Sequence, residues 1–297
     1  MITIRAITPL TLPKHSARSA ALARRLWRVL ALLPALVFVG CSGLREETMS
    51  EPSSHPAAGL YFRTTSLRGV EYPFAVYVPP NLESAPGHGA ARLPAAVFLN
   101  GSGECGTDGT RQLTQGMFPA MLSDPEAWPL IGIFPQKPTR ESVWDDHTEV
   151  VLACVRCAVD EFKADPDRMA LTGLSQGGRG TWMIAAATPG TWSCLAPICG
   201  PMKGVDIDAV AGAIDPAIAV RAFHGTADSV VPASDTLRTA EALRTRRSVL
   251  SAPASSPSVP DNVSITLYEG IDHNSWDRAY RSEGLGIWMA AQKRPAR

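Results

Sequence analysis

The chain has 297 residues, of which 45% are hydrophobic and 19% are charged. This length and composition fit one globular α/β domain of about 230 to 250 residues behind a leader. With 28 basic and 28 acidic residues the formal net charge is zero. A neutral chain has no basic field to attract nucleic acid or anionic lipid, so the composition argues against nucleic-acid binding.

The first forty residues differ in kind from the rest. Their charged side chains are all basic, at Arg5, Lys14, Arg18, Arg24, Arg25 and Arg28. An apolar run over 29–39 follows, too short to span a bilayer comfortably, and it ends in small residues. This is the pattern of a secretory signal peptide. We predict a signal peptide over 1–41, a flexible tether rich in Ser, Glu and Pro over 42–57, and a catalytic domain over 58–297.

Cys41 is a candidate for lipidation. Val39-Gly40-Cys41 resembles the lipobox of bacterial lipoproteins, in which the cysteine becomes the lipidated first residue, although Phe38 stands where leucine is usual. The prediction is an exported protein that is held in the bacterial envelope by a lipid on Cys41. Secretion to the periplasm or the medium without a lipid, and a cytoplasmic location, are the alternatives.

Six cysteines fit an exported enzyme with some disulfides, but they do not make a disulfide scaffold. If Cys41 carries a lipid, five remain and at least one of them is unpaired. Cys154-x-x-Cys157 could be a redox pair or half of a zinc site. Since it lies in an expected helix without a second cysteine pair or a nearby histidine, buried thiols are the preferred interpretation. We expect no metal and no organic cofactor.

The remaining chain alternates between expected strands and helices. Segments 61–67 and 71–78 alternate apolar and polar residues around Arg68-Gly69 and predict a β-hairpin at a sheet edge. Continuous apolar runs predict buried strands at 93–99, 130–134, 169–172, 195–198, 218–223 and 263–268.

Helices are expected between these strands, near 117–122, 149–162, 176–187, 233–244 and 285–292. The segment 165–168 is expected to be a turn. Strands that alternate with helices predict an α/β fold with a mostly parallel sheet and right-handed crossovers. In such a sheet the functional residues gather at the carboxyl ends of the strands.

One stretch organises the predicted chemistry. Gly173, Ser175 and Gly177 form Gly-x-Ser-x-Gly between an expected strand and an expected helix. The spacing sets a serine on a strained strand-to-helix corner with its hydroxyl exposed, and the glycines allow strand and helix to approach. Because glycine and serine are common in turns, an ordinary strand–helix turn would explain the motif equally well on its own.

A serine hydroxyl needs a base to take its proton, and the base needs an orienting acid. Asp228 and His273 each follow an expected strand, so the order Ser175, Asp228, His273 brings all three to one edge of the sheet. Asp272 is an alternative acid, but as the sequence neighbour of His273 it would have difficulty reaching the ring. His224, at the end of a strand, is expected to be a hydrogen-bonded structural residue.

Acyl transfer also needs donors for the developing oxyanion. One is expected to be the backbone N–H of Gln176, directly after the candidate nucleophile. The other should come from the glycine-containing loop 100–106, with the N–H of Ser102 as the preferred donor. A phosphate-binding role for this loop is disfavoured, because no Gly-Lys-Ser/Thr element follows it.

These segments together resemble the α/β-hydrolase superfamily. Within it they are similar to small secreted bacterial esterases: the phospholipase/carboxylesterase, feruloyl-esterase and polyhydroxybutyrate-depolymerase-like group, which includes proteins labelled putative peptidases. The carrying segments are 98–104, 165–168, 173–178, 196–200, 224–228 and 273–276. The resemblance implies the α/β-hydrolase fold, Ser175, Asp228 and His273 as the family triad, and Ser102 and Gln176 at the oxyanion positions.

Two positions depart from the family's pattern. Asn100 stands where histidine is usual before the oxyanion glycine, and Cys105 stands where arginine is common after Glu104. Asparagine can still anchor a loop by side-chain hydrogen bonds, so the change is compatible with activity but could shift substrate preference. Trp144 and Trp276 are expected to line the acyl or alcohol pocket, with core packing as an equal alternative for Trp144.

The sequence therefore predicts hydrolysis of carboxylic esters through an acyl-enzyme, in which Ser175 attacks, His273 carries the proton and Asp228 orients the ring. The expected partner is a small-molecule or polymer-borne ester. Peptide hydrolysis by the same triad ranks second, because the 297 residues hold no propeller or other gating domain. A non-catalytic binding module on a hydrolase scaffold is the third hypothesis. The acyl group, the alcohol group and the oligomeric state stay open.

Overall fold

The computed structural model describes residues 56–83, 92–250 and 262–295. The predicted signal peptide, Cys41 and all but the end of the predicted tether lie outside these ranges, so the expectations of export and lipidation stay predictions. None of the helices within the described ranges is long and apolar enough to cross a membrane.

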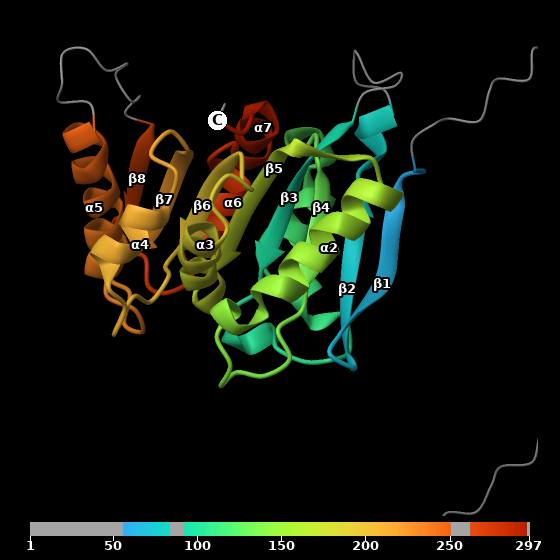
Figure 1. Ribbon diagram of the computed structural model, residues 1–297, viewed down its shortest axis with the longest axis horizontal. Coiled ribbons are helices and arrows are strands. Elements are labelled where there is room, and N and C mark those ends of the chain that lie inside the picture. The colour runs from blue at the N-terminus through green and yellow to red at the C-terminus, as the bar shows by residue number, and fades with distance from the viewer. Residues whose placement is uncertain (1–55, 84–91, 251–261, 296–297) are drawn as a thin grey trace, which may run out of the picture. The chain divides into compact units, whose positions relative to one another are not determined.

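The described residues form a sheet of eight strands in the order β1-β2-β4-β3-β5-β6-β7-β8 (Figure 1). The strands are β1 (Gly59–Leu67), β2 (Val70–Val78), β3 (Leu93–Leu99), β4 (Ile131–Pro135), β5 (Ala164–Leu174), β6 (Cys194–Ile198), β7 (Ala219–Gly225) and β8 (Val263–Tyr268). β1 and β2 pair antiparallel, as do β2 and β4, whereas β3 to β8 run parallel. The predicted mostly parallel sheet with an N-terminal edge hairpin is confirmed.

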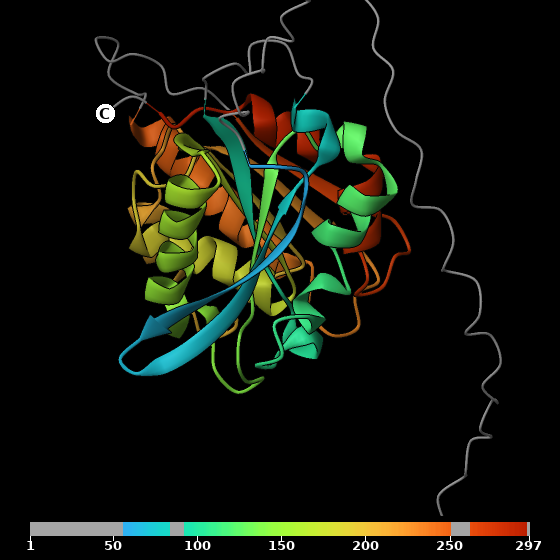
Figure 2. The same cartoon turned by 90° about the vertical axis from the view of Figure 1, so that its right-hand side faces the viewer.

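The hairpin turns where the sequence predicted (Figure 2). Leu67 pairs with Val70 across Arg68 and Gly69, whose φ angles are 53° and 78°. Positive φ at both central residues matches the twist of the flanking strands, and glycine takes this conformation at little cost.

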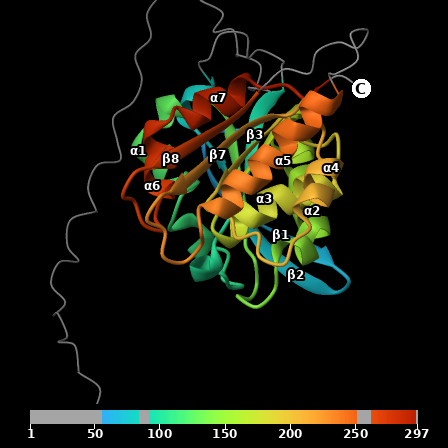
Figure 3. The ribbon, with the colours of Figure 1, turned by 90° about the vertical axis from the view of Figure 1, so that its left-hand side faces the viewer.

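Helices cover both faces of the sheet, as Figure 3 shows. They are α1 (Met117–Ser123), α2 (Thr148–Glu161), α3 (Gln176–Ala187), α4 (Ile207–Ala213), α5 (Ser234–Leu250), α6 (Trp276–Ser282) and α7 (Leu285–Ala291). Short 3-10 turns are η1 (Pro80–Glu83), η2 (Ser102–Glu104), η3 (Arg111–Leu113), η4 (Pro125–Ala127) and η5 (Trp144–His147). α2 to α5 pack on one face, and α1, α6 and α7 pack on the other.

The strand alternation assigns side chains to two separate cores. In β3, Val97 and Leu99 belong to the core under α2 to α5, whereas Ala96 and Phe98 belong to the core under α1, α6 and α7. Every residue of β3 is buried, as expected for a strand covered on both sides. The edge strand β1 instead alternates between half-buried and exposed residues.

Three local features differ from the sequence prediction. The segment 165–168 is not a separate turn but lies inside β5, where the pairing with β3 jumps from Leu93–Ala164 to Ala95–Met169. The extra residues bulge out of the ladder, and Asp165 accepts the N–H of Asp167 at 2.9 Å as in a turn.

The other two differences are the unpredicted helices α4 and α6, each of seven residues. Short helices give too few turns for a clear apolar period. α4 nevertheless carries a readable start signal, because the Asp206 carboxylate caps it by accepting the N–H of Ala209 at 3.0 Å.

Candidate active site

Ser175 occupies a strained corner between β5 and α3. Its φ and ψ are 53° and −118°, a conformation that residues other than glycine seldom adopt. The Ser175 N–H donates to the carbonyl of Ile198 at 2.9 Å, and its carbonyl accepts the N–H of Arg179 at 3.1 Å. These two hydrogen bonds hold the corner against the neighbouring strand β6 and the first turn of α3.

The two motif glycines are required by close backbone approach. A Cβ on Gly177 would lie 1.9 Å from the carbonyl oxygen of Leu99, and one on Gly173 would lie 2.5 Å from the carbonyl oxygen of Gly177. Neither contact is possible between real atoms, so any side chain here forces β3, β5 and α3 apart. The steric reason inferred from the sequence spacing is therefore present in the structure.

The structure brings together the three residues that the sequence analysis singled out. His273, in the loop after β8, places Nε2 3.0 Å from Ser175 Oγ. Its Nδ1 lies 2.8 Å from Oδ2 of Asp228, in the loop after β7. The Asp228 side chain is fully buried, whereas the His273 side chain is 19% exposed. A hydroxyl, an accessible imidazole and a buried carboxylate thus form one hydrogen-bonded line.

Asp228 is held as a carboxylate. Burial by itself would raise the pKa of Asp228, but hydrogen bonds from His273 and from the backbone N–H groups of Val231 and Val230 outweigh it and hold the pKa below its ordinary value. The N–H groups of Val230 and Val231 reach Oδ1 at 2.9 and 2.8 Å. The charge that would stabilise a protonated His273 is therefore present at neutral pH.

Asp272, the alternative acid, points elsewhere. Its Oδ1 accepts the N–H and the hydroxyl of Ser229 at 2.8 and 2.9 Å and the backbone N–H of His273 at 2.7 Å. It joins the loops after β7 and β8 and makes no hydrogen bond to the His273 ring. Among the described carboxylates, Asp228 is the ring's hydrogen-bond partner.

The loop after β3 is anchored by the two residues that depart from the family's pattern. Asn100 is fully buried; its Nδ2 donates to the carbonyl of Gly101 at 2.6 Å, and its Oδ1 accepts the N–H of Lys137 at 3.2 Å. The Cys105 thiol donates to the same Gly101 carbonyl at 3.5 Å. Both side chains therefore fix the backbone that leads to Ser102.

Ser102 and Gln176 occupy equivalent places on adjacent strands. Leu99 of β3 pairs with Gly173 of β5, and each candidate donor follows three residues later as the first residue of a helical turn. The first N–H groups of a helix have no acceptor within that helix. Both N–H groups therefore begin a helical turn just beyond the carboxyl ends of two neighbouring strands, β3 and β5.

The two tryptophans expected to line the pocket lie in different environments. Trp144 is 1% exposed, and its Nε1 donates to the Asn100 carbonyl at 2.9 Å, so it takes the core position rather than that of an open pocket wall. It fits there because Gly180 has no side chain: a Cβ would lie 2.5 Å from the Trp144 Cβ. Trp276 packs edge-on to His273, with ring centroids 5.4 Å apart, and borders the site.

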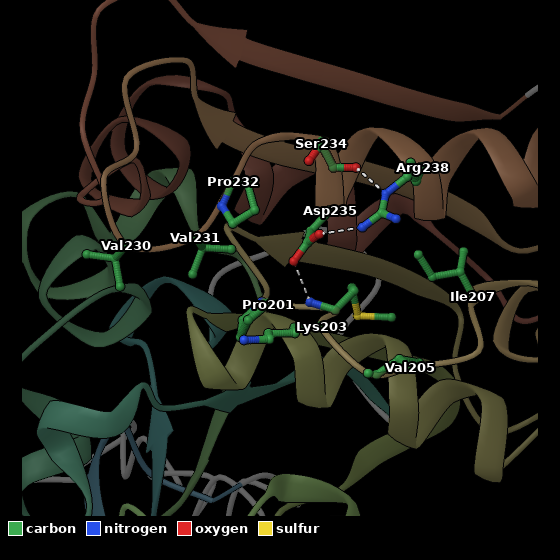
Figure 4. Close-up of a pocket in the computed structure, with 12 residues that line it drawn as sticks. Pro201, Lys203, Val205, Ile207, Val230, Val231, Pro232, Ser234, Asp235 and Arg238 are labelled. Atoms are coloured by element: carbon green, nitrogen blue, oxygen red, sulfur yellow. Dashed lines mark hydrogen bonds and ion pairs between the residues drawn. The ribbon is translucent and has the colours of Figure 1, made fainter.

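A cavity of about 510 Å³ lies at the same edge, between the loop after β6 and the start of α5 (Figure 4). Its apolar lining includes Met202, Val205, Ile207, Val230 and Val231. Both walls continue from the active site: β6 ends at Ile198, which binds Ser175, and the N–H groups of Val230 and Val231 bind Asp228. This cavity was not predicted from the sequence, although two of its apolar residues, Val230 and Val231, follow closely after Asp228.

A hydrogen bond to a buried carboxylate joins the two walls of this cavity. Asp235 of α5 accepts the N–H of Met202 at 2.8 Å and pairs with Arg238 at 2.7 Å. The Asp235 side chain is only 4% exposed, so its charge needs both partners. This cross-link keeps the loop after β6 at a fixed distance from α5.

The described cysteines are all unpaired, so none of the disulfides that the cysteine count would allow is present among them. Cys154 is fully buried, as expected for a core thiol, whereas Cys157 is partly exposed and donates to Glu161 at 3.3 Å. Cys199, with Asp228 and His273, forms a group whose ligand atoms lie within 4.8 Å of one another. Burial raises the pKa of the Cys199 thiol to about 12, and a metal here would displace the proton shared by Asp228 and His273.

No protein-family model and no curated protein matches the chain. Solved structures, in contrast, match it. A thermostable esterase is 25% identical with a TM-score of 0.63, over 79% of this chain and 63% of that one. A feruloyl esterase module from Clostridium thermocellum, crystallised with sinapinate, is 13% identical with a TM-score of 0.59, over 81% and 92%. An acylaminoacyl peptidase from Pyrococcus horikoshii is 11% identical with a TM-score of 0.56, over 82% and 43%.

The chain thus spans less than two thirds of the thermostable esterase it resembles. The less similar matches establish the shape of the chain rather than its reaction. Taken with the sheet order described above, these neighbours show that the chain has the α/β-hydrolase fold.

Proposed function

We propose that this protein hydrolyses carboxylic esters through an acyl-enzyme formed on Ser175. The observation that carries the proposal is the unbroken line of hydrogen bonds from Ser175 Oγ through His273 to the ionised, buried Asp228. A serine at an ordinary strand–helix turn would have no reason to face an imidazole that is itself oriented by a carboxylate.

The steps follow from this geometry. His273 Nε2 takes the Ser175 proton as Oγ bonds to the ester carbonyl carbon, and Asp228 stabilises the imidazolium that forms. The N–H groups of Gln176 and Ser102 receive the developing oxyanion. His273 then returns the proton to the alcohol oxygen as the C–O bond breaks, which leaves the acyl group on Ser175. Water, deprotonated by His273, attacks the acyl carbonyl carbon, and His273 returns that proton to Ser175 Oγ as the bond between Oγ and the acyl carbon breaks and the acid leaves.

The cavity supports binding of one side of the ester. At about 510 Å³ it has room for an apolar acyl or alcohol group, and its walls include Val230 and Val231, which bind Asp228, and the loop that follows Ile198, which binds Ser175. We propose that this group enters between Met202 and Val230, with Trp276 bordering the opposite side of His273.

Filling this cavity should alter chain-length preference. Val230→Trp places a large side chain at the cavity wall while leaving the N–H that binds Asp228 in place. We expect kcat/KM for long-chain p-nitrophenyl esters to fall by roughly tenfold, with little change for the acetate, because only long chains need the space. Val249→Trp is the matched control, since both valines are 67% exposed and Val249 does not line the cavity. An equal loss for acetate and long esters would remove the cavity from the proposal.

The identity of the orienting acid can be tested with a pair of isosteric changes. Asp228→Asn should lower kcat by about 10⁴-fold, because the amide favours the wrong tautomer of His273 and cannot stabilise the imidazolium. Asp272→Asn should change kcat by only a few-fold, since the hydrogen bonds of its carboxylate go to Ser229 and to the backbone N–H of His273 rather than to the ring. Ester hydrolysis rates of the two variants, with thermal unfolding as the check on folding, decide the assignment. The reverse ranking would make Asp272 the acid.

Ester and peptide hydrolysis are separated by matched substrates. A p-nitrophenyl ester and the p-nitroanilide of the same acyl group differ only in the leaving atom. We expect turnover of the ester and none of the anilide. Anilide cleavage at a comparable rate would favour the peptidase alternative instead.

A further inference from the structure

A second histidine lies behind the candidate acid. His224, at the end of β7, is fully buried. Its Nε2 lies 3.1 Å from Oδ2 of Asp228 and 3.0 Å from the carbonyl oxygen of Val231. Its Nδ1 lies 2.7 Å from the hydroxyl of Thr236 in α5. Asp228 Oδ2 therefore faces two imidazole rings, His273 on one side and His224 on the other.

The surroundings of the His224 ring determine where its hydrogen lies. A carboxylate oxygen and a carbonyl oxygen can only accept, so the Nε2 that faces both must carry the hydrogen. The Thr236 hydroxyl can donate to Nδ1, which suits the neutral ring with its hydrogen on Nε2. The ring then acts as a donor whose direction is set by Thr236.

We propose that His224 is a positioning residue for Asp228, and through it for His273. This inference rests on the proposed esterase function. Oδ2 accepts from His273 Nδ1 and lies 3.1 Å from His224 Nε2, while Oδ1 accepts from the N–H groups of Val230 and Val231. Three hydrogen bonds and the adjacent His224 ring thus hold a fully buried carboxylate in one orientation.

Val231 closes this arrangement into a ring of contacts. Its N–H binds Oδ1 of Asp228, and its carbonyl accepts from the same His224 Nε2 that lies 3.1 Å from Oδ2. If the donor on His224 is lost, the buried Val231 carbonyl loses its hydrogen bond and Oδ2 loses the polar group beside it. The carboxylate can then rotate away from His273, which would leave the base poorly oriented although every triad residue is still present.

The direct test compares His224→Gln with His224→Leu. A glutamine can place an N–H donor near the position of Nε2, whereas leucine fills similar space without a donor. For the leucine variant we expect kcat on p-nitrophenyl acetate to fall by about 10- to 100-fold with little change in KM, as for lost supporting contacts at other sites. Glutamine should recover most of this loss.

Thr236→Val gives a second variant that does not touch Asp228. It keeps the side-chain shape and removes the hydroxyl that orients the His224 ring. A few-fold fall in kcat, in the same direction as His224→Leu, is expected. Because the ring itself is retained, this variant also serves if His224→Leu does not fold.

Coupling to Asp228 separates positioning from packing. In an Asp228→Asn background, adding His224→Leu should cost little further activity, since the carboxylate it positions is gone. If His224 only fills the core, His224→Leu should lower the activity by the same factor in both backgrounds. The activities of the leucine and glutamine variants should then follow their unfolding temperatures. Either result would overturn the inference.

A spectroscopic measurement decides the point independently of turnover. The proton between His273 Nδ1 and Asp228 should give a low-field proton resonance that is absent in His273→Gln. We expect His224→Leu to move or broaden it and His224→Gln to restore it; an unchanged resonance in His224→Leu would contradict the inference. An inactive wild-type protein with the expected resonance changes would overturn the esterase proposal while leaving this positioning role intact.

Discussion

Replacing Ser175 with alanine is expected to reduce ester hydrolysis by about 10⁴- to 10⁶-fold, because the residual rate of such variants comes only from binding and the oxyanion donors. Alanine lacks the oxygen that lies 3.0 Å from His273 Nε2 but leaves the backbone contacts of the corner in place. The unfolding temperature should therefore change little. Initial rates on p-nitrophenyl esters of increasing chain length, beside thermal unfolding, measure both effects.

Ser102→Ala provides the matched serine-to-alanine control. Ser102 is assigned a role through its backbone N–H, which alanine keeps, so activity should stay within a few-fold of wild type. Two results would contradict the account. One is substantial turnover by Ser175→Ala, which would move the nucleophile elsewhere. The other is equal inactivity of Ser102→Ala, which would give its hydroxyl a role that we do not assign.

Gly177→Ala is expected to have the largest effect on stability. The new Cβ would lie 1.9 Å from the Leu99 carbonyl oxygen, 2.6 Å from the Leu99 carbonyl carbon and 2.9 Å from the Asn100 carbonyl oxygen. Backbone atoms of a buried strand cannot rotate away as a side chain can. Separation of α3 from β3 should cost about 3 kcal/mol or more in the free energy of unfolding and move the Gln176 N–H. Urea unfolding and esterase assays should both report the loss.

Gly103→Ala is the control for this change. It lies in the same region of the sheet edge, but an added Cβ would meet nothing within 4 Å. Its φ is not positive, so alanine should alter the free energy of unfolding by less than about 1 kcal/mol. Equal stability of the two variants would show that β3 and α3 can separate freely, which would contradict the close packing of Gly177 on Leu99.

The elements that frame the site could be predicted because their signals are local. The hairpin turn at Arg68-Gly69 and the start of α3 at Gln176 follow from residue type and spacing alone. The grouping of Ser175, Asp228 and His273 also followed, because each was expected just after a strand of one parallel sheet and such strand ends share an edge.

What escaped prediction depends on contacts between distant segments. The cavity forms only when Asp235 of α5 binds the loop that follows β6. Trp144 enters the core because Gly180 leaves room for it, a complementarity that neither segment reveals by itself. His224 was expected to be structural, and its burial and its bonds to Thr236 agree, but its contact with Asp228 needs the loop after β7 to fold back.

Covalent labelling with a fluorophosphonate, followed by mass spectrometry of the digested protein, tests directly whether Ser175 is the nucleophile. Such probes react with a serine only when a neighbouring base activates it. We expect one equivalent of label on the peptide that contains Ser175, with none in Ser175→Ala and strongly reduced labelling in a His273→Gln variant. Absence of labelling in the folded wild-type protein, or label on another serine, would contradict the assignment of Ser175 as the nucleophile.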